Sequence, residues 1–540
     1  MKKSCTFLLF LLGFYFGQSQ IIHKPKLVIG ITIDQMRWDY LYRYENRFAS
    51  NGGFKRLLNK GFSCENTLIP YTPTVTASGH ASIYSGSIPA INGITGNSWF
   101  DNVNQQYVYC TDDSTVSPVG TTSVAGKMSP VNMLSNSICD ELKLATNFRS
   151  KVIGIALKDR GGILPAGHSA DAAYWYDSKS GNWITSTYYM NELPTWVTAF
   201  NNEKNIDKYY QKGWSTMYPK ESYLQSTNDE NEYEVKALGP GGFPYDLRPL
   251  VGKNYNAILA TPYGNTLTTE FAKNAIKNEK LGADSITDFL AISYSSPDYV
   301  GHSFGPNSIE TEDTYLRLDK ELGELLDFFD ATVGKDQYLL FLSADHGAAH
   351  VPAFLKDKKI PAGNINIQFL VDTLNKQLKD KFGKVNLIQD IINSQVVINL
   401  PLIEANNKVR IEDVTKIILH YLANEKSVYR TFLLDDLQNT TLNSTLKSMI
   451  ANGYYPARSG HIQIIFKPQW IENFEKGGTT HAVWNPYDAH IPLIWYGWNI
   501  KNGAVNRKTY MTDIAPTLAA LLKIQEPNGS IGNVITELLK

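Results

Sequence analysis

The sequence predicts an α/β fold: a doubly wound, mostly parallel sheet with helices on both faces. The first observation behind this prediction is a set of apolar runs without polar–apolar alternation, which is typical of strands buried on both faces of a parallel sheet. The second is helical periodicity between the runs, because strands and helices that alternate along a chain build such a sheet.

Five apolar runs are the predicted strands, and they span residues 27–33, 151–157, 289–294, 338–342 and 491–496. Before the fourth run, one helical face is formed by Leu318, Leu322, Leu325 and Phe329. Polar residues follow the first four runs at close range. Ligands of doubly wound folds bind beyond the carboxyl ends of the strands, so we expect the site at that edge of the sheet.

Two stretches interrupt this alternation, and we interpret both as insertions that cap or flank the site. Residues from about 165 to 260 are rich in Tyr, Gly, Pro and Asn. Residues from about 350 to 475 contain an amphipathic helix at 411–422 and a short strand at 396–400. We therefore expect one catalytic domain over residues 21–540, with both insertions inside it.

Residues 1–20 have the pattern of a secretory signal peptide. Positive Lys2 and Lys3 precede an apolar run at 7–16 and a polar end at 17–20. The apolar run is too short to cross a bilayer, which takes about 20 residues. We expect export to the periplasm or the exterior of the cell, with no stable membrane association.

Charge and cysteine content exclude other kinds of partner and site. The formal net charge is −1, so the chain lacks the basic field that attracts nucleic acid. Once Cys5 leaves with the signal peptide, Cys64, Cys110 and Cys139 remain, in spacings that match no cysteine-based zinc motif. They allow at most one disulfide, whose pairing stays open. The oligomeric state stays open too, and a monomer is compatible with the sequence.

Asp298 and His302 are the first candidate metal ligands. Their i, i+4 spacing places both side chains on one face of a helix, and a carboxylate with an imidazole suits Zn²⁺. An incidental ion pair on an exposed turn would show the same spacing. The pair alone does not decide between the two interpretations.

Four further candidates lie near strand ends. Asp345 and His346 follow the fourth strand, Asp34 follows the first, and His481 precedes the last. The structural alternatives are a strand-end cap for Asp345 and His346, and a helix N-cap for Asp34. His481 could be a buried structural histidine, and His490 is a competing choice of ligand in the same segment. Together the six candidates supply about three ligands for each of two zinc ions roughly 4 Å apart.

Thr76 is the candidate nucleophile. It precedes the small residues 77–80, which can open a helix, and the N–H groups of a helix N-terminus attract an anion. A metal ion bound to the Thr76 oxygen would lower the pKa of the hydroxyl. A capping role for Thr76 or Ser78 explains the same pattern, and it would be preferred without the metal ligands.

The ordered motifs resemble those of the alkaline phosphatase superfamily. PTVTASGH resembles the nucleophile segment of nucleotide pyrophosphatase/phosphodiesterases, and PDYVGHSFGP and SADHG resemble their later metal motifs. The resemblance extends over residues from about 26 to 522 and is strongest to the periplasmic PafA-type alkaline phosphatases, which hydrolyse phosphate monoesters. It implies an alkaline phosphatase-like fold, two zinc ions, and a reaction through a phospho-threonine intermediate at Thr76.

The resemblance also implies a role for each of the other candidate site residues. One zinc ion would be held, together with Thr76, by Asp34, Asp345 and His346. The other zinc ion would be held by Asp298, His302 and His481. The non-bridging phosphate oxygens of the substrate would be contacted by Asn97, Lys158 and Arg160.

Lys158 and Arg160 favour a small-molecule phosphate monoester as the substrate. A monoester is a dianion, which two positive charges match, whereas a diester has one charge less and a second bulky group. The structural alternative for both residues is a solvated strand end. A phosphodiesterase or nucleotide pyrophosphatase on the same scaffold stays open, as does a non-catalytic surface-binding protein. A sulfatase is disfavoured because residues 76–80 lack its Cys/Ser-x-Pro-x-Arg segment, and a phosphomutase because it would not usually be exported.

Overall fold

The computed structural model describes residues 24–239, 241–383, 386–405, 408–472 and 477–539, and the predicted signal peptide lies outside them. Ten strands form the central sheet in the order β20-β2-β19-β11-β1-β10-β7-β8-β9-β6, in which β20 is Gly503–Val505 and β2 is Phe62–Cys64. Its middle is parallel and consists of β11 (Tyr338–Ser343), β1 (Leu27–Ile33), β10 (Asp288–Tyr294), β7 (Val152–Ala156) and β8 (Ala172–Asp177).

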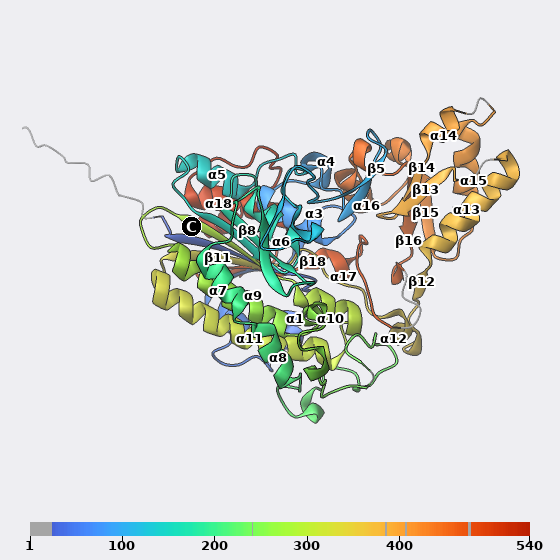
Figure 1. Ribbon diagram of the computed structural model, residues 1–540. Helices are drawn as coiled ribbons and strands as arrows, with labels where there is room; N and C mark the ends of the chain where they lie inside the picture. The colour runs from blue at the N-terminus through green and yellow to red at the C-terminus, as the bar shows by residue number, and fades with distance from the viewer. Residues whose placement is uncertain (1–23, 240, 384–385, 406–407, 473–476, 540) are drawn as a thin grey trace, which may run out of the picture.

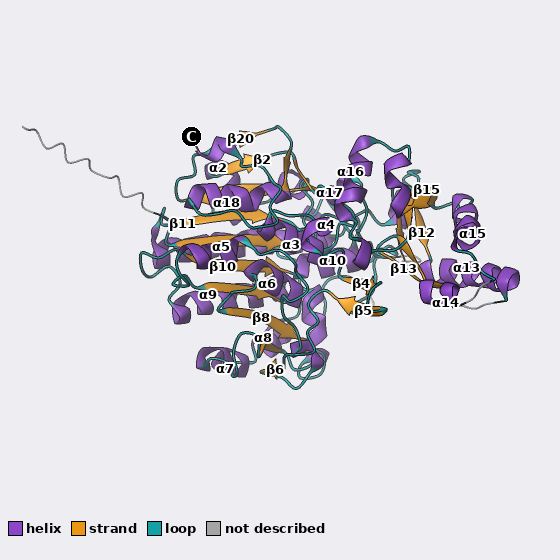
Figure 2. Cartoon of the chain, turned by 90° about the horizontal axis from the view of Figure 1, so that it is seen from above, coloured by secondary structure: helices purple, strands orange, loops and turns teal. Residues whose placement is uncertain are grey.

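These parallel strands confirm four of the predicted strands and explain their composition. Every residue of β1, β7, β10 and β11 is buried, because helices cover both faces of the sheet (Figures 1 and 2). One face carries α3 (Thr76–Ser85), α5 (Ile138–Ala145) and α18 (Ile514–Leu522). The other face carries α9 (Tyr263–Glu279) and α11 (Ile309–Phe329), whose buried side contains the predicted apolar residues. The predicted doubly wound α/β fold is therefore confirmed.

The fifth apolar run differs from the prediction. It forms β19 (Leu493–Gly497), which pairs antiparallel with β11, so the parallel orientation was wrong for this strand. Burial on both faces produces a continuous apolar run in either orientation, and only the chain connection decides the direction. The outer strands β9 (Asn182–Ser186) and β6 (Pro118–Val119) are antiparallel to their neighbours as well.

The two interrupting stretches lie in different parts of the fold. Residues 165–260 supply β8 and β9 to the central sheet and then α7 (Thr195–Asn202) and α8 (Asn205–Lys212) beside α9. Within residues 350–475, a separate apolar core packs α13 (Ile367–Phe382) and α15 (Ile411–Ala423) on a four-stranded sheet, forming the lobe at the right of Figure 1. The strands of this lobe, in spatial order, are β13 (Ile388–Ile392), β14 (Gln395–Ile398), β16 (Ile462–Phe466) and β15 (Val428–Leu433).

Two further observations concern the surroundings of the protein. Among the described residues, no helix combines the length and the apolar character needed to cross a membrane. Cys64, Cys110 and Cys139 are all buried free thiols, so the disulfide that the sequence left open is not formed.

Candidate active site

The carboxyl ends of the parallel strands bring four charged side chains together. Asp34 follows β1, Lys158 follows β7, Asp298 follows β10, and Asp345 follows β11. Because the strands are parallel, these ends meet at one edge of the sheet, as the sequence predicts. All four side chains are buried, with exposures between 0% and 5%.

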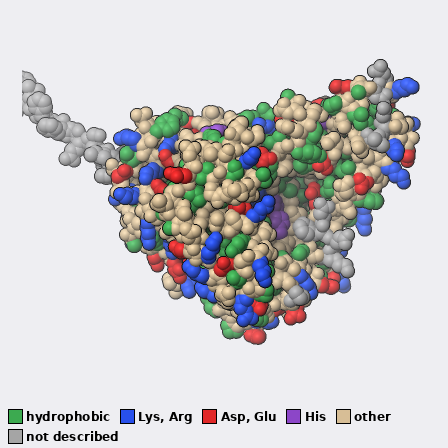
Figure 3. Space-filling model, viewed as in Figure 1, with side chains coloured by type: hydrophobic (Ala, Val, Ile, Leu, Met, Phe, Trp, Pro, Cys, Tyr) green, Lys and Arg blue, Asp and Glu red, His purple; other side chains and the backbone are tan. Residues whose placement is uncertain are grey.

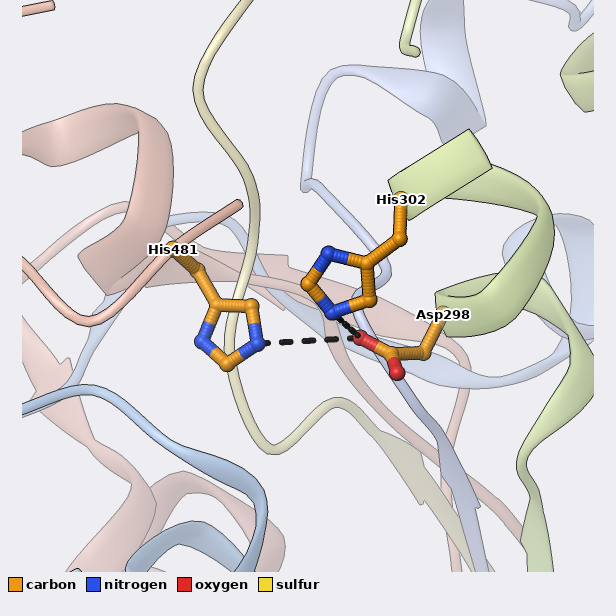
Figure 4. Close-up of side chains that lie close together, drawn as sticks. All are labelled: Asp298, His302 and His481. Atoms are coloured by element: carbon orange, nitrogen blue, oxygen red, sulfur yellow. Dashed lines mark ion pairs between the residues drawn. The ribbon is translucent and has the colours of Figure 1, made fainter. Parts of the chain in front are cut away.

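Asp298 lies between two histidines, as Figure 4 shows. Asp298 and His302 share one face of α10 (Ser296–Phe304), with 3.1 Å between Asp298 Oδ1 and His302 Nε2. His481 comes from the loop before α17 (Pro486–Ala489), and its Nε2 is 3.7 Å from the same carboxylate oxygen. These three residues form a group whose ligand atoms all lie within 4.8 Å of one another.

A second group surrounds His346. Its Nε2 lies 3.5 Å from Asp34 Oδ1 and 3.4 Å from Asp345 Oδ2. Asp34, Asp298 and His346 also have ligand atoms within 4.8 Å of one another, so Asp298 adjoins both groups. The six residues predicted as metal ligands therefore lie together in one continuous cluster.

Each of the three histidines is oriented by a backbone carbonyl. Nδ1 of His302, His346 and His481 lies 2.8, 3.0 and 2.7 Å from the carbonyl oxygens of Thr479, Gly347 and Thr74, respectively. A carbonyl only accepts hydrogen bonds, so each Nδ1 is the protonated donor. Nε2 of the neutral ring then presents a lone pair to the cluster, which is the arrangement of a metal-binding histidine.

The cluster fits divalent metal ions. Ligand atoms about 2.0–2.1 Å from a tetrahedral zinc ion lie about 3.3 Å from one another, close to the distances between these nitrogens and oxygens. Among the described residues, the buried atoms Asp34 Oδ1 and Asp345 Oδ2 have no hydrogen-bond partner. Buried carboxylate oxygens are rarely left in that state, and bound cations would satisfy both.

Lys158 reaches into the same cluster. Its Nζ lies 2.7 Å from Asp34 Oδ2 and 2.5 Å from Asp298 Oδ2. Burial alone would lower the pKa of Lys158, but the carboxylates of Asp298 and Asp34 outweigh it, so its pKa is raised and the ammonium stays charged. Lys158 is also the N-cap residue of α6 (Asp159–Ala166), which fixes the start of its side chain.

Thr76 is the first residue of α3, and its buried hydroxyl faces the cluster. Thr76 Oγ1 is 3.4 Å from His346 Nε2 and 3.4 Å from Lys158 Nζ. Gly79 permits this approach, because a Cβ atom at that position would lie 2.6 Å from Cβ of Asp345. The alternative hydroxyl, Ser78 Oγ, instead donates to the carbonyl of Ile94 at 2.7 Å.

Asn97 contacts the start of the same helix, and Arg160 lies in the first turn of α6. Asn97 Oδ1 accepts the N–H of Ala77 at 2.9 Å. The Asn97 amide nitrogen therefore points away from the Ala77 N–H and can donate to another group. Arg160 Nη1 donates to the Tyr109 hydroxyl at 2.9 Å. Arg160 Nε is buried without a hydrogen-bond partner among the described residues, and a bound anion would satisfy it.

The structure separates His481 from its competitor His490. His490 stacks on Trp38 with 4.5 Å between ring centroids, and its Nε2 is 3.0 Å from the Glu65 carbonyl oxygen. It takes part in packing and is absent from both groups of candidate ligands. His481 is therefore the histidine of this segment that joins the cluster.

Three residues that contribute to the site were not predicted from the sequence: Gln35, His80 and Tyr109. Gln35 donates from Nε2 to Asp298 at 2.6 Å and from its backbone N–H to Asp345 at 3.1 Å. His80 lies 2.8 Å from both the Thr76 carbonyl and Ser293 Oγ, and the Tyr109 hydroxyl donates to Asp159 at 2.8 Å. The i, i+4 spacing of Thr76 and His80 was a usable signal. Tyr109, on β5 (Gln106–Tyr109), had none.

A hollow lies between the body that contains the central sheet and the lobe, on the face that Figure 3 shows. Figure 3 shows histidine side chains in this hollow, with Lys or Arg side chains at its edge. A small anionic molecule could enter from solvent and meet positive charge at the entrance.

Comparison with known proteins identifies relatives over nearly the whole chain. A protein from Myroides odoratus named calcium-transporting ATPase is 52% identical over 97% of this chain and 96% of its own. Alkaline phosphatase PhoV from Synechococcus elongatus is 51% identical over 96% of this chain and 94% of its own.

Alkaline phosphatase PafA from Elizabethkingia meningoseptica is 48% identical over 97% of this chain and 96% of its own. A crystal structure of wild-type alkaline phosphatase PafA matches 96% of this chain and 99% of its own chain with a TM-score of 0.93. The family described as type I phosphodiesterase / nucleotide pyrophosphatase matches residues 28–488. These matches confirm the resemblance seen in the motifs, and the chain belongs to the type I phosphodiesterase/nucleotide pyrophosphatase family.

Proposed function

We propose that this protein is an alkaline phosphatase that hydrolyses phosphate monoesters and releases inorganic phosphate. One observation carries the proposal: the Thr76 hydroxyl lies at a helix N-terminus, 3.4 Å from both His346 and Lys158, beside six side chains of metal-binding type. The names of PhoV and PafA, both alkaline phosphatases about half identical to this chain, support the same activity.

Two zinc ions are the proposed cofactors. Asp34, Asp345, His346 and Thr76 would hold one, and Asp298, His302 and His481 the other. Their mixed nitrogen and oxygen donors suit zinc, although manganese and iron accept similar sets. When bound, the ions supply positive charge that polarises oxygen atoms and stabilises the negative charge developing on them.

Thr76 is the proposed nucleophile of a two-step reaction. Its Oγ attacks phosphorus, the bond to the leaving alcohol breaks, and phospho-threonine forms; water then attacks the same phosphorus and restores the hydroxyl. The backbone N–H groups at the start of α3 favour the anionic phosphoryl group. Asn97, Lys158 and Arg160 would orient its oxygens, so that positioning and electrostatics supply most of the rate.

The charge of the site favours monoesters over diesters. Lys158 is buried and Arg160 half-buried, two residues apart in sequence, and a dianion would match the two cations better than a monoanion. The name of the Myroides relative points to ATP, whose terminal phosphoryl group carries the same kind of charge as a monoester. Hydrolysis of such a group needs no different arrangement of residues.

Metal removal and substrate choice test the proposal together. A chelator should abolish hydrolysis of an aryl phosphate monoester, and added zinc should restore it. With zinc restored, kcat/KM for the monoester should exceed that for the matching diester by at least about tenfold, or ~1.4 kcal/mol. Preference for the diester would instead identify a phosphodiesterase. Fewer than about one bound zinc per chain would favour the non-catalytic alternative.

Export and domain organisation complete the proposal. Residues 1–20 would direct secretion to the periplasm or the exterior, where the catalytic domain at 21–540 would act on small phosphate esters. The segments at about 165–260 and 350–475 would shape access to the site.

A further inference from the structure

Among the six candidate metal ligands, His481 has the least support from regular secondary structure. The other five follow a strand closely or lie on α10, whereas His481 lies in a loop before α17. The next residue, Ala482, has a φ of +88°, a conformation that a residue with a Cβ atom rarely adopts. Such strain persists where surrounding contacts impose it, and it often marks a functional site.

The contacts that impose this conformation converge on Asp488. Its side chain is buried, and its Oδ2 accepts the backbone N–H of Val483 at 2.9 Å. The Thr74 hydroxyl lies 2.9 Å from the Val483 carbonyl oxygen and 3.3 Å from Asp488 Oδ2. The Thr74 carbonyl, in turn, is the acceptor for His481 Nδ1 at 2.7 Å. Asp488 thus closes a ring of hydrogen bonds around the strained turn.

The backbone of the same segment binds the turn that carries His346. Gly347 donates its N–H to the Asp488 carbonyl at 2.7 Å, and Ala348 donates to the Tyr487 carbonyl at 3.1 Å. The segments that carry Thr76 and His481 therefore meet at the Asp488 side chain, and the segment that carries His346 meets the backbone of the same residue.

A carboxyl group at position 488 is energetically unfavourable as a packing residue. Among the described residues, it has no salt-bridge partner within 4.0 Å, and a buried carboxyl without such a partner destabilises a fold. Burial raises the pKa of Asp488 well above its usual value. A role in the geometry of the site accounts for an acidic residue here better than packing does.

We propose that Asp488 is a positioning residue that holds the loop of His481, so that His481 Nε2 completes the zinc site with Asp298 and His302. It acts through the Val483 N–H and Thr74 and does not touch the substrate. This inference rests on the zinc dependence proposed above.

Zinc binding by purified variants tests it without reference to activity. Zinc content and affinity are measured at equilibrium in zinc buffers. Asp488→Ala should weaken one of the two zinc sites by about 10- to 100-fold, the usual effect of losing a residue that orients a ligand. Asp488→Asn keeps an oxygen for the Val483 N–H and should retain most of the affinity. Adding Ala482→Gly to Asp488→Ala should restore part of it, because glycine tolerates the positive φ.

The matched control is Asp319→Ala. Asp319 is also buried and also accepts two backbone N–H groups, from Ala49 and Phe54 at 2.9 Å each, but it lies on α11 away from the site. This variant should lose stability and still bind two zinc ions with unchanged affinity. A uniform loss at both sites in Asp488→Ala, matched by Asp319→Ala, would show a merely structural role and overturn the proposal.

Two other results are equally decisive. Unchanged affinity at both zinc sites in Asp488→Ala would overturn the positioning role while leaving the proposed function intact. Failure of the wild-type protein to bind two zinc ions would instead refute the proposed cofactors. If Asp488→Ala does not fold, Thr74→Val replaces it, with an expected loss of at least about threefold at one site because the hydroxyl contact is gone. Wild-type affinity in Thr74→Val would then overturn the proposal.

Discussion

Replacing Thr76 with alanine should lower kcat for an aryl phosphate monoester by at least about a thousandfold, the scale on which loss of a nucleophile acts. The reason is that the Thr76 hydroxyl is the group proposed to form the bond to phosphorus. Zinc content should not change, because six side chains besides Thr76 remain to hold the ions. Steady-state kinetics and metal analysis on the same preparation check both expectations.

Ser78→Ala is the matched control for this variant. Ser78 is two residues further along α3, is equally buried, and donates to the Ile94 carbonyl at 2.7 Å. Its loss should leave kcat within a few-fold of the wild type, and Thr76→Ser should retain measurable turnover. If Thr76→Ala keeps near-native activity, the nucleophile is Ser78 or water.

Lys158→Ala and Arg160→Ala should change substrate preference. Each should lower kcat/KM for a monoester by about 10- to 100-fold, since a hydrogen bond from a charged donor contributes about 1.5–3 kcal/mol. The loss for the matching diester should be much smaller, because a diester has one negative charge less. Measuring both substrates with each variant separates lost charge recognition from general damage.

Arg149→Ala serves as the control for charge removal. Arg149 is exposed, and its Nε donates to the Thr146 carbonyl at 3.0 Å. It lies in the loop between α5 and the amino end of β7, whereas the site follows the carboxyl ends of the strands. Its removal should leave the ratio of monoester to diester activity unchanged. Equal losses for both substrates in Lys158→Ala and Arg160→Ala would remove the basis for a preference for monoesters.

The parts of the fold that could be predicted from sequence are those with a local signal. Strands buried on both faces appear in the sequence as continuous apolar runs. Residues that follow such a run closely, such as Asp34 and Asp345, are therefore predicted to lie at the carboxyl edge of the sheet. Asp298 and His302 were predictable as a pair because one helical turn brings them together. The order of these motifs along the chain added the family resemblance.

The remainder depends on contacts between distant segments. The antiparallel direction of β19 is set by its chain connection. The apolar composition of the strand does not indicate that direction. Tyr109 reaches Arg160 from a hairpin 51 positions earlier in the chain. Asp488 contacts Thr74 across 414 positions, so no spacing pattern could associate the two.

The central claim, that phosphoryl transfer passes through Thr76, is tested most directly by the stereochemical course of the reaction at phosphorus. The measurement uses a phosphate monoester made chiral with oxygen isotopes and follows transfer of its phosphoryl group to an acceptor alcohol. Each in-line displacement inverts phosphorus, so a phospho-threonine intermediate predicts net retention. Net inversion would mean a single direct displacement and would contradict the proposed role of Thr76.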